Sequence, residues 1–63
     1  MKRAKVYEDP LTREKLEGMA TIFAEWGPLD RDGLQNCTVR FDDDPGEQLL
    51  VRKVHPDDIQ EQS

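Results

Sequence analysis

The side chains best suited to nucleophilic chemistry are one cysteine and one histidine. Cys37 and His55 are the only residues of their types in the 63-residue chain. A nucleophilic cysteine needs a lowered thiol pKa and a nearby base. The two residues fall on consecutive predicted strands, but Cys37 belongs to the apolar parity of its strand. The pattern favours a packed, inert thiol, so we expect no catalytic residue and no enzymatic activity.

Two acidic segments have the residue types that bind hard cations. Residues 30–33 read Asp-Arg-Asp-Gly, like the start of a calcium loop, but the twelfth position of that loop falls on Phe41 instead of a glutamate. Residues 42–44 are consecutive aspartates, and successive side chains of a strand point apart. A structural zinc site needs four Cys or His ligands, which this chain does not contain. We therefore expect no metal and no cofactor.

Aromatic and cationic side chains are the candidates for contacting a partner, because tryptophan, tyrosine and arginine dominate interface hot spots. The binding residues predicted on this basis are Tyr7, Phe23, Trp26, Arg40 and Arg52. Two other roles stay open for them. The aromatic rings fit the rim of a small core, and the arginines fit cross-strand pairs with acids.

Charge and hydropathy restrict the kind of partner. Fourteen acidic residues against nine basic ones give a net charge of −5. Binding to nucleic acid depends on clustered cations, and here the bases form small groups near acids, so direct binding is not favoured. No segment approaches the roughly 20 apolar residues of a membrane span, and the N-terminus lacks a signal-peptide pattern. We expect a cytoplasmic protein with no membrane contact.

Alternating hydropathy and turn residues predict a chain made of short strands. The predicted strands are 4–7 at a sheet edge, then 19–26, 34–42 and 48–55. Between the first two, residues 11–17 predict a structured loop that contains at most one helical turn.

The turns and the end of the chain have their own signals. Pro45-Gly46 fits the central positions of a type II turn. Residues 56–59 predict a single 3₁₀ turn with Ile59 folded back onto the core, and residues 60–63 predict a disordered polar tail.

The parity of each strand predicts which side chains face the core. In 19–26 the even-numbered residues share one apolar face, from Ala20 to Trp26. In 34–42 the alternation is clean, with Cys37, Val39 and Phe41 inward and the residues between them outward. The last strand is ambiguous, and a bulge near residues 52 and 53 would bring Leu49, Val51 and Val54 to one side.

This order of elements resembles the Src-homology-3-like small barrel, including its Tudor- and KOW-type members. The residues that carry the resemblance are 18–22, 38–43 and 54–59. It implies an all-β fold: a small, strongly twisted antiparallel barrel over residues 1–59, closed by one helical turn. It also implies a binding module that uses loop ends and an exposed groove. The paired aromatics and acidic loop of a proline-peptide groove are not present in this sequence.

These observations favour a small non-enzymatic protein-interaction module. A protein partner or self-association is expected, because a domain of this size gains stability when it associates. A regulatory protein that binds or mimics nucleic acid is the alternative. A subunit of an oligomeric enzyme with a shared site is the second alternative.

Overall fold

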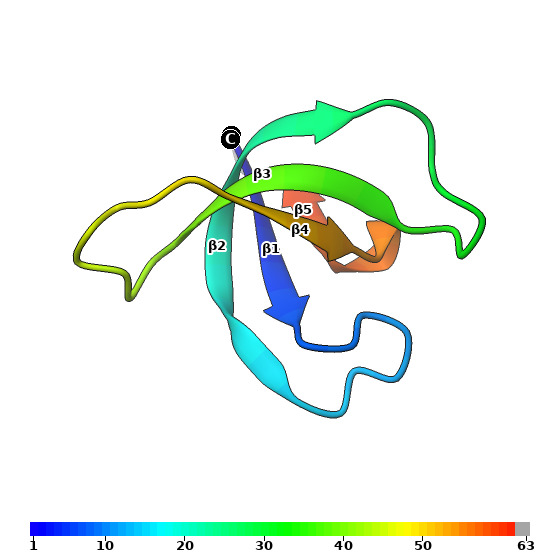
Figure 1. Ribbon diagram of the computed structural model, residues 1–63, viewed down its shortest axis with the longest axis horizontal. Coiled ribbons are helices and arrows are strands. Elements are labelled where there is room, and N and C mark those ends of the chain that lie inside the picture. Colours follow the sequence, from blue (N-terminus) through cyan, green and yellow to red (C-terminus); the bar gives the residue numbers. More distant parts are fainter. Residues whose placement is uncertain (62–63) are drawn as a thin grey trace.

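The computed structural model describes residues 1–61, and within them five strands form one antiparallel sheet (Figure 1). The strands are β1 (Lys2–Tyr7), β2 (Leu16–Trp26), β3 (Gln35–Phe41), β4 (Leu50–Val54) and β5 (Ile59–Glu61). Their order is β4-β3-β2-β1-β5, so β4 and β5 are the two edges. The all-β prediction is confirmed, whereas the sheet is not closed into a complete barrel.

A 3₁₀ helix, η1 (Pro56–Asp58), joins β4 to β5 at the position where the sequence predicts a single turn. His55 caps this helix, because its Nδ1 accepts a hydrogen bond of 3.1 Å from the backbone N–H of Asp57. Ile59 follows and packs against the core, as predicted. In the part of the chain that the structure describes, no helix is long and apolar enough to span a membrane.

Strand β2 is the element shared by both halves of the sheet. Its first part pairs with β1, in a register that sets Ala4 opposite Ala20, and its second part pairs with β3. Ala20, Thr21 and Ile22 are paired on both sides and all three are buried. The strand therefore begins at Leu16, earlier than predicted, because its first residues pair with β1 even though the loop pattern there is polar.

A bulge at Phe23 changes which side chains of β2 face the core. Ile22 lies opposite Val39 and Ala24 lies opposite Thr38, so Phe23 is an extra residue without a partner in the ladder. One extra residue reverses the parity of everything that follows. The predicted face from Ala20 to Trp26 is therefore wrong beyond Ile22, and Trp26 lies on the outside.

The expectation that the first strand is an edge strand is wrong. β1 pairs with β2 on one side and with β5 on the other, where Lys2 lies opposite Glu61. The predicted disordered tail is wrong for Gln60 and Glu61, which belong to β5. Residues 62 and 63 of that prediction lie outside the described residues.

The bulge that would resolve the ambiguous pattern of the last strand is not present between Leu50 and Val54. From Leu50 opposite Val39 to Val54 opposite Gln35, the β3–β4 register is continuous. Val54 is buried and its neighbours alternate, so Val51 faces outward with 62% of its surface exposed. The apolar residues of this strand therefore divide between the two faces of the sheet.

Side-chain and backbone hydrogen bonds define the turn after β1 and the turn between β3 and β4, and the second differs in type from its prediction. The turn after β1 is capped by Asp9, whose Oδ1 accepts hydrogen bonds from the backbone N–H groups of Leu11 (2.9 Å) and Thr12 (3.3 Å). In the β3–β4 connection, the N–H of Glu47 donates to the carbonyl of Asp44 (3.1 Å), so residues 45 and 46 are central as predicted. The turn is not type II, however, because the left-handed residue is Glu47, with φ 50°, rather than the glycine.

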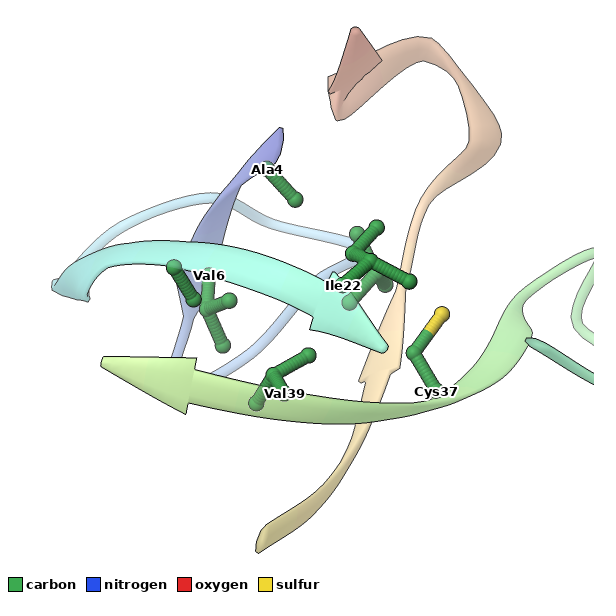
Figure 2. Packing of buried hydrophobic residues seen from close by; sticks show 7 residues of the cluster. Ala4, Val6, Ile22, Cys37 and Val39 are labelled. Carbon is green, nitrogen blue, oxygen red and sulfur yellow. The ribbon is translucent and has the colours of Figure 1, made fainter. Parts of the chain in front are cut away.

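The core is small and made of small side chains. It consists of Ala4, Val6, Ala20, Ile22, Cys37, Val39 and Val54, with Phe41 and Ile59 packed against it. Figure 2 shows its labelled members pointing into one shared space between β1, β2 and β3. The inward parity predicted for the third strand, with Cys37, Val39 and Phe41, is confirmed.

The core assignment predicts that substitution of valine by alanine lowers stability much more at a buried valine than at an exposed one. Val39→Ala should lower the free energy of unfolding by about 2 kcal/mol, because it opens a cavity in a core with few other contacts. Val51→Ala is the matched control on the outside, and its effect should stay within about 0.5 kcal/mol. Urea unfolding followed by circular dichroism measures both. Equal losses would contradict the register of β3 and β4.

Candidate functional site

The structure divides the five predicted binding residues between two surfaces. Phe23, Trp26 and Arg40 lie together on the outer side of β2 and β3. Tyr7 and Arg52 line a groove between the two long loops. The five residues therefore do not form one surface.

The first surface is the outer side of β2, β3 and β4, which we call the outer face. Ala24, Thr38 and Val51 form a row across its three strands, because each lies opposite the next in the antiparallel ladder. Phe23 and Trp26 lie on either side of this row along β2, with 52% and 56% of their surfaces exposed. Arg40 lies on the same side of β3 as Thr38, two residues further along the strand, and completes the outer face.

A hydrogen bond fixes the indole of Trp26 on the sheet. Trp26 Nε1 donates to the hydroxyl of Thr38 at 2.7 Å, although the direct ladder partner of Trp26 is Asn36. The ring therefore reaches diagonally along β3 and covers part of the strand. With its one polar atom satisfied, the rest of the indole is an apolar surface held in one orientation.

Arg40 is held in place by a ring instead of by an acid. Its guanidinium carbon lies 5.3 Å from the centroid of Phe23, a cation–π distance. Among residues 1–61, Arg40 forms no ion pair. A positive charge on an apolar surface is thus left available to a partner.

A polar cluster borders the outer face on the side of β1. Arg3 Nη1 donates to Thr21 Oγ1 at 3.0 Å and to Asp42 Oδ1 at 2.8 Å, and Nη2 pairs with Asp42 Oδ2. These hydrogen bonds from Arg3 hold the pKa of Asp42 below its usual range, with a further contribution from the charge of Arg40. Asp42 is therefore occupied by Arg3, which leaves Arg40 without a carboxylate.

The second surface is a groove of about 360 Å³ between the two long loops. Residues 7–11 form one wall, Asp32 and Leu34 the second, and Arg52 and Lys53 of β4 the floor between them. The loop behind the second wall is organised by Asp30, whose Oδ1 accepts from the N–H groups of Asp32 (2.9 Å) and Leu34 (3.0 Å).

The basic residues of the groove are already paired within the chain. Arg52 binds Glu17 from Nε (3.0 Å) and Nη2 (3.1 Å), and its guanidinium lies 5.8 Å from the centroid of Phe41. The hydrogen bond to Glu17 raises the pKa of Arg52. Lys53 Nζ lies 3.1 Å from Asp30 Oδ2. Arg52 thus links β4 to the start of β2, and this structural role explains its presence without a ligand.

Cys37 and His55 do not form a catalytic pair. Cys37 is fully buried, and burial together with the carboxylate of Glu25 raises the pKa of its thiol to about 11. A nucleophilic cysteine requires the opposite shift. His55 accepts the hydrogen bond that caps η1 at Nδ1, so the lone pair of that nitrogen is engaged by the backbone.

The acidic segments are used for local structure. Asp44 accepts hydrogen bonds from the backbone N–H groups of Gly46 (2.9 Å) and Gln48 (3.1 Å), while Asp42 is bound to Arg3. Over residues 1–61, no three His, Cys, Asp or Glu side chains are grouped as a metal ion requires.

Sequence reasoning missed two residues of the outer face. Thr38 was placed on the wet side of its strand, which is correct, but its bond to Trp26 depends on the bulge at Phe23. The side of Val51 is ambiguous in the sequence, and the bulge that would bring it to the side of Val54 is not present between Leu50 and Val54. If side chains alternate strictly between the two sides of the strand from Leu50 to Val54, Val51 lies on the side opposite Val54. This regular alternation is the signal that places Val51 outside.

The Trp26–Thr38 hydrogen bond predicts a spectroscopic effect. Thr38→Val keeps the shape of the side chain but removes the acceptor, so the indole should become more mobile. We expect lower steady-state fluorescence anisotropy of Trp26, the only tryptophan, with the fold preserved by circular dichroism. Thr12→Val, in the loop after β1, is the control and should leave the anisotropy unchanged.

The buried thiol predicts a pH dependence of stability. The folded state holds the Cys37 proton more tightly than the unfolded chain, so this contribution is complete below about pH 9 and is lost as the pH rises towards 11. The free energy of unfolding of Cys37→Ala should therefore fall less over this range than that of the original protein. Parallel slopes would show that the thiol is not buried as described. At neutral pH, a thiol reagent should label Cys37 much more slowly in the folded than in the urea-unfolded protein.

Comparison with family models, with curated proteins and with solved structures finds no match for this chain.

Proposed function

We propose that the protein is a non-enzymatic interaction module that binds another protein through its outer face. The observation that carries this proposal is the grouping of Phe23, Trp26 and Val51, each more than half exposed, on one side of β2, β3 and β4. Contiguous exposed apolar side chains on a small protein are typical of interaction sites.

The distribution of side-chain size supports the proposal. The largest fully buried side chains are three valines and Cys37, whereas the larger Phe23 and Trp26 lie on the surface. A domain of 63 residues has a marginal core, and large rings inside it would stabilise the fold most. Their position outside is explained by an interface that buries them in the bound state.

We also propose the finer fold assignment, a Src-homology-3-like barrel in which the open sheet curls on itself. Three features support it: the long β2 shared by both halves, the loop between β1 and β2, and η1 directly before β5. Modules of that kind act by binding, although fold alone does not determine function.

The state of the basic side chains supports a protein partner over nucleic acid. Most of them are in ion pairs with acids of the same chain, including Lys2 with Glu25 and Arg13 with Asp58. Neutralising a phosphate backbone requires a row of available cations, and the net charge of the chain is −5.

The proposal predicts which substitutions abolish capture of a partner. The double variant Phe23→Ser, Val51→Ser should lose the proteins that the original chain retains from a native lysate. The matched control is Leu16→Ser, Leu29→Ser, which removes two similarly exposed apolar side chains outside the outer face and should retain them. Circular dichroism and urea unfolding confirm that both variants fold.

Sedimentation over a range of concentrations distinguishes the two kinds of partner. Dimerisation that the face variant abolishes would identify a second copy as the partner. The proposal fails if the face variant and the control retain the same proteins and sediment alike.

A further inference from the structure

We propose that the outer face recognises a protein segment that presents an aspartate or glutamate between apolar side chains, with Arg40 binding the carboxylate. This inference rests on the proposed function and specifies the chemistry of the partner. It is carried by the state of Arg40, by the charges around it and by the chemistry of its neighbours.

Arg40 is prepared to bind a carboxylate. Its guanidinium lies 5.3 Å from the Phe23 ring centroid, so part of its position is fixed before a ligand arrives. A guanidinium has its N–H donors in one plane, where they match the two oxygens of a carboxylate, and a contact with a ring does not use these donors. Such charge-assisted pairs are stronger than neutral hydrogen bonds, and more so where apolar groups exclude water.

The carboxylate whose pKa responds to the charge of Arg40 is engaged by another group. Asp42, the residue after the end of β3, is bound by two nitrogens of Arg3, and elsewhere in the chain Asp30 is paired with Lys53. In the β3–β4 turn, Asp44 binds backbone N–H groups. Of the outer-face side chains Phe23, Ala24, Trp26, Thr38, Arg40 and Val51, Arg40 is the charged one, and its charge is opposite in sign to the net charge of −5.

The side chains around Arg40 indicate which residues should flank the acid in the bound segment. Phe23, Ala24, Trp26 and Val51 offer apolar surface, and the polar atom of the indole is already satisfied by Thr38. A ligand that covers these residues must be apolar on both sides of its carboxylate. A segment with only acidic residues would leave the rings exposed, and one with only apolar residues would bury Arg40 without a counter-charge.

A second copy of this chain fits the outer face less well. A two-fold axis that passes close to Arg40 would set this arginine against its own symmetry mate, and Asp42, which is bound by Arg3, would not separate the two charges. Nucleic acid fits less well too, because a single arginine neutralises one phosphate. The occupant to which the charges point is a different protein with an acidic, apolar segment.

The test selects its ligands from random peptide sequences. A phage-displayed library of random dodecapeptides is panned against the folded full chain, and synthetic versions of the enriched peptides are titrated while the emission of Trp26 is followed. We expect enriched peptides to contain Asp or Glu flanked by apolar residues. Arg40→Gln should weaken them by about tenfold to a hundredfold, the range of a charged hydrogen bond.

Matched variants isolate the role of the charge. Arg31→Gln makes the same change at an exposed arginine of the β2–β3 loop and should leave binding unchanged. Arg40→Glu should reverse the preference, so that peptides with Lys in place of the acid bind better than the original ones. Circular dichroism shows whether each variant is folded.

The outcomes separate this inference from the proposed function. Peptides that shift Trp26 emission but lack an acid, or that bind Arg40→Gln as well as the original protein, overturn the inference and leave the interaction face in place. If no peptide perturbs Trp26, or if Phe23→Ser, Val51→Ser does not weaken the peptides, the inference is overturned, whereas the proposed function is decided separately by the capture and sedimentation experiments.

Discussion

The pairing of β2 on both of its sides is the constraint on which the rest of the structure depends. Over Ala20, Thr21 and Ile22 this strand is bonded to β1 and β3 at once, and these residues are buried. Beyond Ile22 the strand pairs only with β3. Because Phe23 is an extra residue, the even-numbered Ala24 and Trp26 point outward after the bulge, whereas even-numbered residues point inward before it. The same element thus supplies the centre of the core and, a few residues later, the rings of the outer face.

The division of charged residues follows from this arrangement. Arg3, Arg52 and Lys53 lie where a neighbouring strand or loop brings an acid within reach, and each is paired. Arg40 lies opposite Thr21 in the ladder and beside the bulged Phe23, so its nearest partner is a ring. An exposed ion pair contributes little to stability, but it determines which cations remain available to a ligand.

Sequence reasoning identified the strand content and the inward face of β3, because alternation there is regular from Cys37 to Phe41. It could not locate the bulge, since a single extra residue at Phe23 has no signature in hydropathy. It also read residues 60 and 61 as tail, because polar residues form a strand here only by pairing with β1. Of the predicted binding residues, Phe23, Trp26 and Arg40 converge, whereas Arg52 has a polar partner, Glu17, that only the tertiary fold reveals.

The pairing of Lys2 with Glu61 has a consequence for the order in which the sheet forms. It joins residues from opposite ends of the described chain, so it closes a far larger loop than the β2–β3 and β3–β4 connections do. Closing a large loop costs more conformational entropy, and nonlocal pairing slows folding. The strands β1 to β4, which are joined in sequence by short connections and include the outer face, are therefore the part of the sheet that can assemble first. β1 gains its second neighbour only after β5 has been synthesised and has docked.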